Sequence, residues 1–295
     1  MVSQTKSSRF FKRTNIVFAT LHVVLVIVQL VVLWVKSPLD PFFNIRTIGT
    51  KSIPVYPVVC SIVVNAMAVI FHIIYECATD HVMENSFQLH YVNHTRWLYH
   101  TVTDGLSLMV ILLLFKVERL DTLLLVFLVH TGIMATNYYQ DQYLRDIHWS
   151  PLIAPHTFSL GLYLSLVLFL VMWCMQRLDR ENPPQLVVSI TVLVFICLIF
   201  VIQKIHIYYG QRVIENIELN EDTDSVSAST QERKKTNSSE IKDLETASDL
   251  IEQKNTVVYN IIYFELYYYI VSFIVHLLTS ALAIDNVLMV STMFD

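Results

Sequence analysis

The chain has 295 residues, of which 54% are hydrophobic and only 15% are charged, whereas soluble globular proteins carry about 25% charged residues. Residues 212–256 hold 11 acidic and 6 basic side chains, so the other 250 residues carry only 14 of each sign. A soluble domain cannot cover its surface with so few charges, and no basic patch suited to nucleic acid is present. The composition therefore excludes a soluble enzyme and a nucleic-acid binder, and it predicts a multi-pass protein of the lipid bilayer.

Apolar runs long enough to cross about 30 Å of hydrocarbon occur seven times along the chain. Their limits are 15–35, 55–75, 97–115, 120–139, 153–175, 186–208 and 257–283. None of them alternates with a period of two residues, as the strands of a transmembrane barrel do. The predicted fold class is therefore all-α, a bundle of seven transmembrane helices.

The distribution of Lys and Arg predicts the orientation of this bundle. With the N-terminus in the cytoplasm, the inner segments hold thirteen of these residues and the outer segments hold seven, and cytoplasmic segments are the ones enriched in positive charge. The predicted order is a basic cytoplasmic N-terminus (1–14), six helices (15–211), an acidic loop (212–256), and the last helix with an external C-terminus (257–295). The loop is rich in Ser and Thr, which predicts a largely disordered cytoplasmic segment that binds a partner or is phosphorylated.

Polar side chains recur within five of the predicted helices at intervals of one or two turns, so each set shares one helix face. They are Asn15, His22 and Gln29; Asn65 and His72; His100, Asp104 and Ser107; His130 and Asn137; and Glu265, Ser272 and His276. Polar groups are costly in hydrocarbon, which predicts that these faces line the interior of the bundle. His100 and Asp104 are a candidate proton relay, and a hydrogen bond between helices is the alternative interpretation for His130.

Several stretches resemble heliorhodopsins, the seven-helix relatives of microbial rhodopsins whose N-terminus is cytoplasmic. In chain order they are Asn15…His22, Ile70-Phe71-His72, Arg96-Trp97, Asn137-Tyr138-Tyr139-Gln140-Asp141, Gln203 and Glu265…Tyr268…Ser272. The resemblance covers nearly the whole chain apart from the long acidic loop. It implies a rhodopsin-like bundle, a homodimer, and a polar cavity lined by His22 and His72.

The departures from the family concern its chromophore. Four residues after the serine that corresponds to Ser272, the family has the lysine that forms the retinal Schiff base, and this chain has His276. The family's glutamate counterion, two residues after Arg-Trp, is replaced by Tyr99, and a glycine beside the chromophore is replaced by Asn137. An imidazole cannot form a Schiff base, so the resemblance implies that covalent retinal binding has been lost.

Three functions remain open at this point. The first is a non-pumping binding or signalling module that is not an enzyme, holds no covalent cofactor, and contacts an unknown cytoplasmic partner through residues 212–256. A noncovalent retinoid is compatible with it. The second is a proton or ion conductor that uses the buried histidines with His100 and Asp104. The third is a metal site, for zinc or another transition metal, at His22, His72 and His276, which the resemblance expects to converge.

Overall fold

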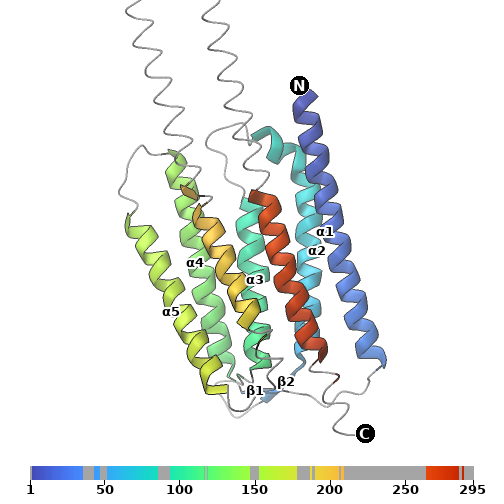
Figure 1. The fold of residues 1–295 in the computed structure, drawn as a ribbon, viewed down its shortest axis with the longest axis vertical. Coiled ribbons are helices and arrows are strands. Elements are labelled where there is room, and N and C mark those ends of the chain that lie inside the picture. Colours follow the sequence, from blue (N-terminus) through green and yellow to red (C-terminus); the bar gives the residue numbers. More distant parts are fainter. Residues whose placement is uncertain are drawn as a thin grey trace, which may run out of the picture.

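A computed structural model provides the structure of the chain (Figure 1). It describes residues 2–35, 43–46, 52–85, 94–115, 117, 119–146, 153–177, 187, 190–205, 207–208, 264–285 and 288. The helices run alongside one another as an elongated bundle, with α1 on one flank and α5 on the other. The acidic loop 212–256 lies outside the described residues, so the predictions made for it stay predictions.

The described part of the chain is almost entirely helical. Its helices are α1 (Val2–Val35), α2 (Pro57–Asn85), α3 (His94–Leu114), α4 (Leu120–Asp146), α5 (Ile153–Arg177), and two without labels in Figure 1, Ile190–Ile205 and Phe264–Asp285. Five contain a segment long and apolar enough to cross a membrane, namely Arg9–Val35, Pro57–Cys77, His94–Leu114, Leu120–Gln142 and Phe264–Asp285. The apolar segments Thr157–Trp173 and Ile190–Ile205 are shorter. A helical membrane-type architecture is thus confirmed.

Some helices extend beyond the predicted apolar runs. α1 begins at Val2 rather than at residue 15, and α2 continues to Asn85 rather than ending at residue 75. The predicted limits followed hydrophobicity, but helical hydrogen bonding continues through polar residues such as Lys12 that are themselves good helix formers. The basic N-terminal segment is therefore part of the first helix.

The all-α prediction missed a short β-hairpin. β1 (Phe43–Arg46) pairs antiparallel with β2 (Ser52–Val55), and Arg46 also forms an isolated bridge with Arg119. The hairpin lies at the end of the bundle opposite the N-terminus (Figure 1). Ile45 belongs to the same buried apolar cluster as residues at the C-terminal end of α3. Strands of four residues are too short to leave a periodic signal in the sequence.

α3 is the central helix of the bundle. In its most apolar window 72% of the residues are buried, against 17% in α1. The outer surfaces carry large apolar side chains, including Leu125, Leu128, Leu168 and Met172, each more than half exposed. The interior holds buried polar side chains from α1, α2, α3, α4 and Phe264–Asp285. Apolar surfaces outside and polar groups inside are the arrangement that a lipid solvent favours.

Candidate functional site

Three histidines from three helices lie together in the interior. His22 comes from α1, His72 from α2 and His276 from Phe264–Asp285, and each side chain is at most 1% exposed. The ring centroids of His22 and His72 are 5.7 Å apart with the rings stacked, and those of His22 and His276 are 5.1 Å apart. The structure therefore brings together the three imidazoles that the resemblance expected to converge. Within the described residues, His22 is the ring that contacts both of the others.

Two amide side chains fix the orientation of two of these rings. His22 Nδ1 lies 2.9 Å from Asn65 Oδ1, and His72 Nδ1 lies 3.2 Å from Asn15 Oδ1. The amide of Asn65 is itself oriented, because its Nδ2 donates to the backbone oxygen of Ser61 at 2.9 Å. A carboxamide oxygen only accepts, so the Nδ1 atoms carry the protons and donate. In a neutral ring of this tautomer, Nε2 is the nitrogen that carries the lone pair.

His276 differs from its two neighbours. Neither of its ring nitrogens has a hydrogen-bond partner among the described residues, although the side chain is completely buried. The Nε2 atoms of His22 and His72 also have no partner in that part of the chain. Buried polar atoms are costly when their hydrogen bonds are unmade. Chemically, the cluster offers both donors and acceptors to a small ligand with hydrogen-bonding groups.

The geometry does not form the metal site that was one alternative. Among the residues that the structure describes, no group of three His, Cys, Asp or Glu side chains is placed to hold a metal ion. The reason lies in the ring arrangement: His22 and His72 stack face against face, and their Nδ1 atoms are directed to Asn65 and Asn15. Tetrahedral ligation instead needs ring nitrogens directed at one common point.

Tyr99, His100 and Asp104 extend the cluster onto α3. The Tyr99 ring centroid lies 5.7 Å from that of His72 and 6.4 Å from that of His276, so Tyr99 adjoins the histidines. Tyr99 also lies beside His100, with 5.0 Å between the ring centroids. His100 Nδ1 is 2.9 Å from Asp104 Oδ2, and both side chains are buried. The two candidate relay residues thus form a buried histidine–carboxylate pair next to the cluster.

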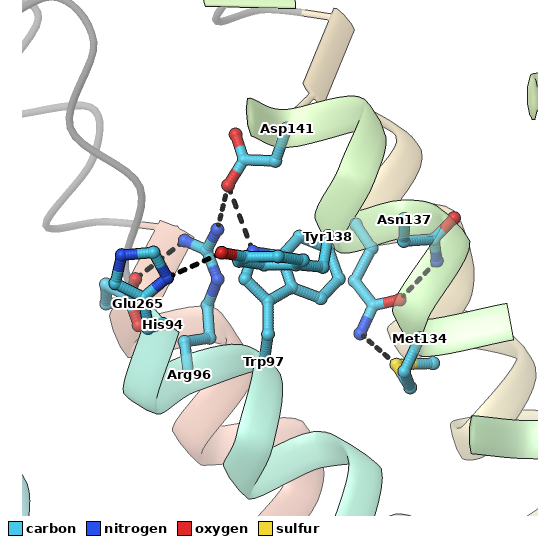
Figure 2. Close-up of polar contacts among 9 residues, drawn as sticks. His94, Arg96, Trp97, Met134, Asn137, Tyr138, Asp141 and Glu265 are labelled. Carbon is cyan, nitrogen blue, oxygen red and sulfur yellow. Dashed lines mark hydrogen bonds and ion pairs between the residues drawn. The ribbon is translucent and has the colours of Figure 1, made fainter. Parts of the chain in front are cut away.

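Three further predicted residues have clear positions. Ser272 is fully buried one turn before His276 on the same helix. His130 Nε2 donates to the backbone oxygen of His100 at 3.1 Å, which is the hydrogen bond between helices expected for it. Asn137 donates to Gln203 Oε1 at 3.1 Å (Figure 2), and no contact found among the described residues joins Asn137 to the histidines.

A buried ion-pair network near the start of α3 was missed by sequence reasoning. Arg96 donates through Nη1 to Glu265 at 2.8 Å and through Nη2 to Asp141 at 2.9 Å, and Trp97 Nε1 donates to the same Asp141 oxygen at 3.0 Å (Figure 2). The three charged residues are at most 4% exposed and come from α3, α4 and Phe264–Asp285. Each of the three charged residues has a place in the sequence analysis, but nothing in the sequence pairs them. The available signal was that Arg96 and Asp141 flank predicted helices 97–115 and 120–139 on the same membrane side.

A second network links α1, α2 and Phe264–Asp285 beyond the histidines. Gln29 Nε2 donates to Ser61 Oγ at 2.7 Å, and Asn65 Nδ2 donates to Ser280 Oγ at 2.9 Å. Ser280 in turn donates to the backbone oxygen of His276 at 2.6 Å. Gln29 and Asn65 belong to the predicted polar faces, whereas Ser61 and Ser280, one turn from Asn65 and His276, are not part of that prediction. These bonds hold the three histidine-bearing helices in register.

Neither the comparison with protein families nor that with curated proteins finds a match to this chain.

Proposed function

We propose that the chain is a heliorhodopsin-like protein of seven transmembrane helices that has lost covalent retinal binding and acts as a non-pumping binding or signalling module. It is not an enzyme under this proposal, and it works in the bilayer as a homodimer. The acidic loop 212–256 is its contact with a cytoplasmic partner. A mass near twice 34.2 kDa after mild solubilisation, corrected for bound detergent, is expected for the dimer.

One observation carries the proposal, the environment of His276. Its imidazole is completely buried between His22 of α1 and Tyr99 of α3, and both ring nitrogens lack a hydrogen-bond partner among the described residues. In a heliorhodopsin-like bundle this position belongs to the lysine that holds retinal. An imidazole there binds no aldehyde covalently, but it can donate and accept hydrogen bonds to a noncovalent ligand.

The orientation is the first testable part of this proposal. Thirteen inner against seven outer Lys and Arg residues favour a cytoplasmic N-terminus and an external C-terminus. With tags at both ends in sealed vesicles of known sidedness, protease should remove one tag and spare the other. Equal protection of both tags would mean an even number of spans and would contradict the seven-helix proposal.

The buried Arg96 favours a non-transporting role over proton conduction. The polar interior extends from the Arg96–Glu265 pair through Tyr268, whose ring lies 5.2 Å from that of His100, to the histidines. A guanidinium held by two carboxylates does not release its protons in a protein, so Arg96 cannot pass a proton along this path. The His100–Asp104 pair can therefore exchange protons locally without completing a transmembrane path.

A flux measurement separates these two functions. In liposomes with an imposed pH gradient and a trapped pH-sensitive dye, the protein is expected to dissipate the gradient no faster than empty liposomes do. Asp104→Asn should then make no difference, and a protonophore serves as the positive control. A protein-dependent flux that Asp104→Asn or His276→Leu abolishes would instead establish the conducting function.

A further inference from the structure

Lys204 has an unusual environment for a lysine between helices. It lies half-buried in Ile190–Ile205, and its Nζ donates to Gln140 Oε1 and to Ser159 Oγ, each at 2.6 Å. Nζ also lies 5.3 Å from the centroid of the Phe200 ring. Within the described ranges no carboxylate lies at ion-pair distance from it, so its known oxygen partners there are neutral. An ammonium group has three donors, and a neutral amide and hydroxyl use only two of them.

The amide of Gln140 supplies a second donor at the same place. Gln140 on α4 is completely buried, and its Nε2 has no hydrogen-bond partner among the described residues. Its Oε1 accepts from Lys204 Nζ, and Nε2 belongs to the same amide group. The unused Nε2 donor therefore lies close to the ammonium group. The Lys204 ammonium and the Gln140 amide nitrogen each have a hydrogen that no described hydrogen bond uses. Two such donors, one of them charged, match the two oxygens of a carboxylate.

An apolar groove lies on the same seam between α5 and Ile190–Ile205. It has a volume of about 320 Å³, and none of its eleven lining residues is charged. Its inner wall includes Leu166, Leu170 and Ile196, which are buried, while its rim includes Met175 and Val194, which are 64% and 59% exposed. The groove therefore opens toward the outside of the bundle, where lipid chains lie.

Lys204 and the groove are consecutive along the two helices. On α5, Ser159 is one turn from Tyr163, which lines the groove. On the facing helix, Lys204 is one turn from Phe200, and Phe200 stacks on Tyr163 with 3.9 Å between ring centroids. At a rise of 1.5 Å per residue, Lys204 and Val194 are separated by about 15 Å along the helix. The polar end and the apolar groove thus form one elongated site with an aromatic pair between them.

We propose that this seam binds a long-chain fatty acid from the bilayer, with its carboxylate at Lys204 and Gln140 and its tail in the groove. A single lysine and one amide form a compact head site, which suits a carboxylate better than a bulky phosphodiester. A groove of about 320 Å³ suits one acyl chain rather than two. The site is separate from the histidine cluster and does not depend on the function proposed for it.

The test uses the full-length protein in phosphatidylcholine nanodiscs and a palmitic acid that carries a photoreactive diazirine in its tail. Photolabels located by peptide mass spectrometry are expected within residues 163–175 and 190–197. Lys204→Gln should weaken saturable labelling about tenfold, because a hydrogen-bonded ion pair with the carboxylate is lost. Lys204→Arg should retain most of it, and Lys12→Gln, a lysine on α1, should leave it unchanged.

A second pair of variants tests the groove without touching the polar end. Val194→Trp places a large ring at the exposed rim and should reduce labelling, whereas Leu198→Trp, on the same helix but outside the groove lining, should not. Labelling by the photoreactive methyl ester, which has no carboxylate, should be the same with and without Lys204→Gln. The proposal would be overturned if neither Lys204→Gln nor Val194→Trp reduced labelling by the acid. Displacement of the acid by equimolar phosphatidylglycerol would assign the site to a lipid headgroup and would equally overturn it.

Discussion

Replacing Arg96 with methionine is expected to reduce the free energy of unfolding by about 3–5 kcal/mol, because it removes the cation from a buried ion-pair network. Glu265 and Asp141 would keep their positions at 2% and 4% exposure without the guanidinium that now lies 2.8 and 2.9 Å from them. Methionine approximates the arginine stem, so most of the loss is electrostatic rather than a packing defect. The measurement is the midpoint of unfolding in detergent as the SDS fraction rises, followed by circular dichroism.

Two further variants identify the cause of that loss. Arg96→Met combined with Glu265→Gln and Asp141→Asn should recover much of the stability, since no uncompensated charge then remains buried. Arg119→Gln removes a different arginine, whose partner Asp121 lies with it at the exposed surface, and should change the midpoint little. If Arg96→Met and Arg119→Gln lowered the unfolding midpoint equally, the buried Arg96 network would contribute no more to stability than an exposed ion pair does.

His276→Lys combined with Tyr99→Glu is expected to produce a visible absorption band with all-trans-retinal. The lysine restores an amine at the depth of the buried imidazole, and the glutamate supplies a carboxylate at a position whose ring lies 6.4 Å from that of His276. A protonated Schiff base in a site of low polarity needs such a carboxylate to keep its proton. The absorption spectrum of the purified protein after incubation with retinal measures the outcome.

The single variant His276→Lys separates the two roles. Without a glutamate at position 99 it should give an adduct that absorbs only in the near-ultraviolet, because the nearby carboxylate of Asp104 is held by His100 at 2.9 Å. A visible band from this single variant would mean that Asp104 serves as the counterion, and Asp104→Asn should then remove the band. No adduct in either variant, with helical content unchanged, would contradict the assignment of His276 to the lysine position.

Much of the helical architecture could be predicted because a bilayer restricts what a backbone can do. Runs of about twenty apolar residues, such as the one within α1, must be helical to satisfy their own hydrogen bonds. The same restriction made polar residues informative. Asn15, His22 and His72 recur on helix faces, and the structure buries all three.

The hairpin and the pairings of charged residues could not be predicted as readily, because they depend on which helix ends meet. Phe43–Arg46 and Ser52–Val55 are too short for periodicity, and their pairing depends on a loop between α1 and α2. Arg96 meets Glu265 across 169 positions of sequence. Hydrophobicity assigns each residue to a helix or its flank, but it contains no information about the partner on another helix.

The site at Lys204 depends still more on tertiary structure. In the sequence this lysine stands at the end of an apolar run and resembles a residue that extends to the headgroups. Its contacts with Gln140 and Ser159 exist only because α4 and α5 pack beside it. The convergence of His22, His72 and His276, by contrast, was expected from the family resemblance, which supplied the tertiary information that a single sequence lacks.

The most direct test of the proposed loss of the chromophore is borohydride trapping on the unmodified protein. The protein is incubated with all-trans-retinal, reduced, and its intact mass is compared with that of His276→Lys treated in the same way. We expect no visible band and no retinyl adduct on the unmodified chain, because the rings that contact His276 belong to His22 and Tyr99 and not to an amine, while His276→Lys gains one retinyl group. A trapped retinyl adduct within a helix of the unmodified protein would contradict it.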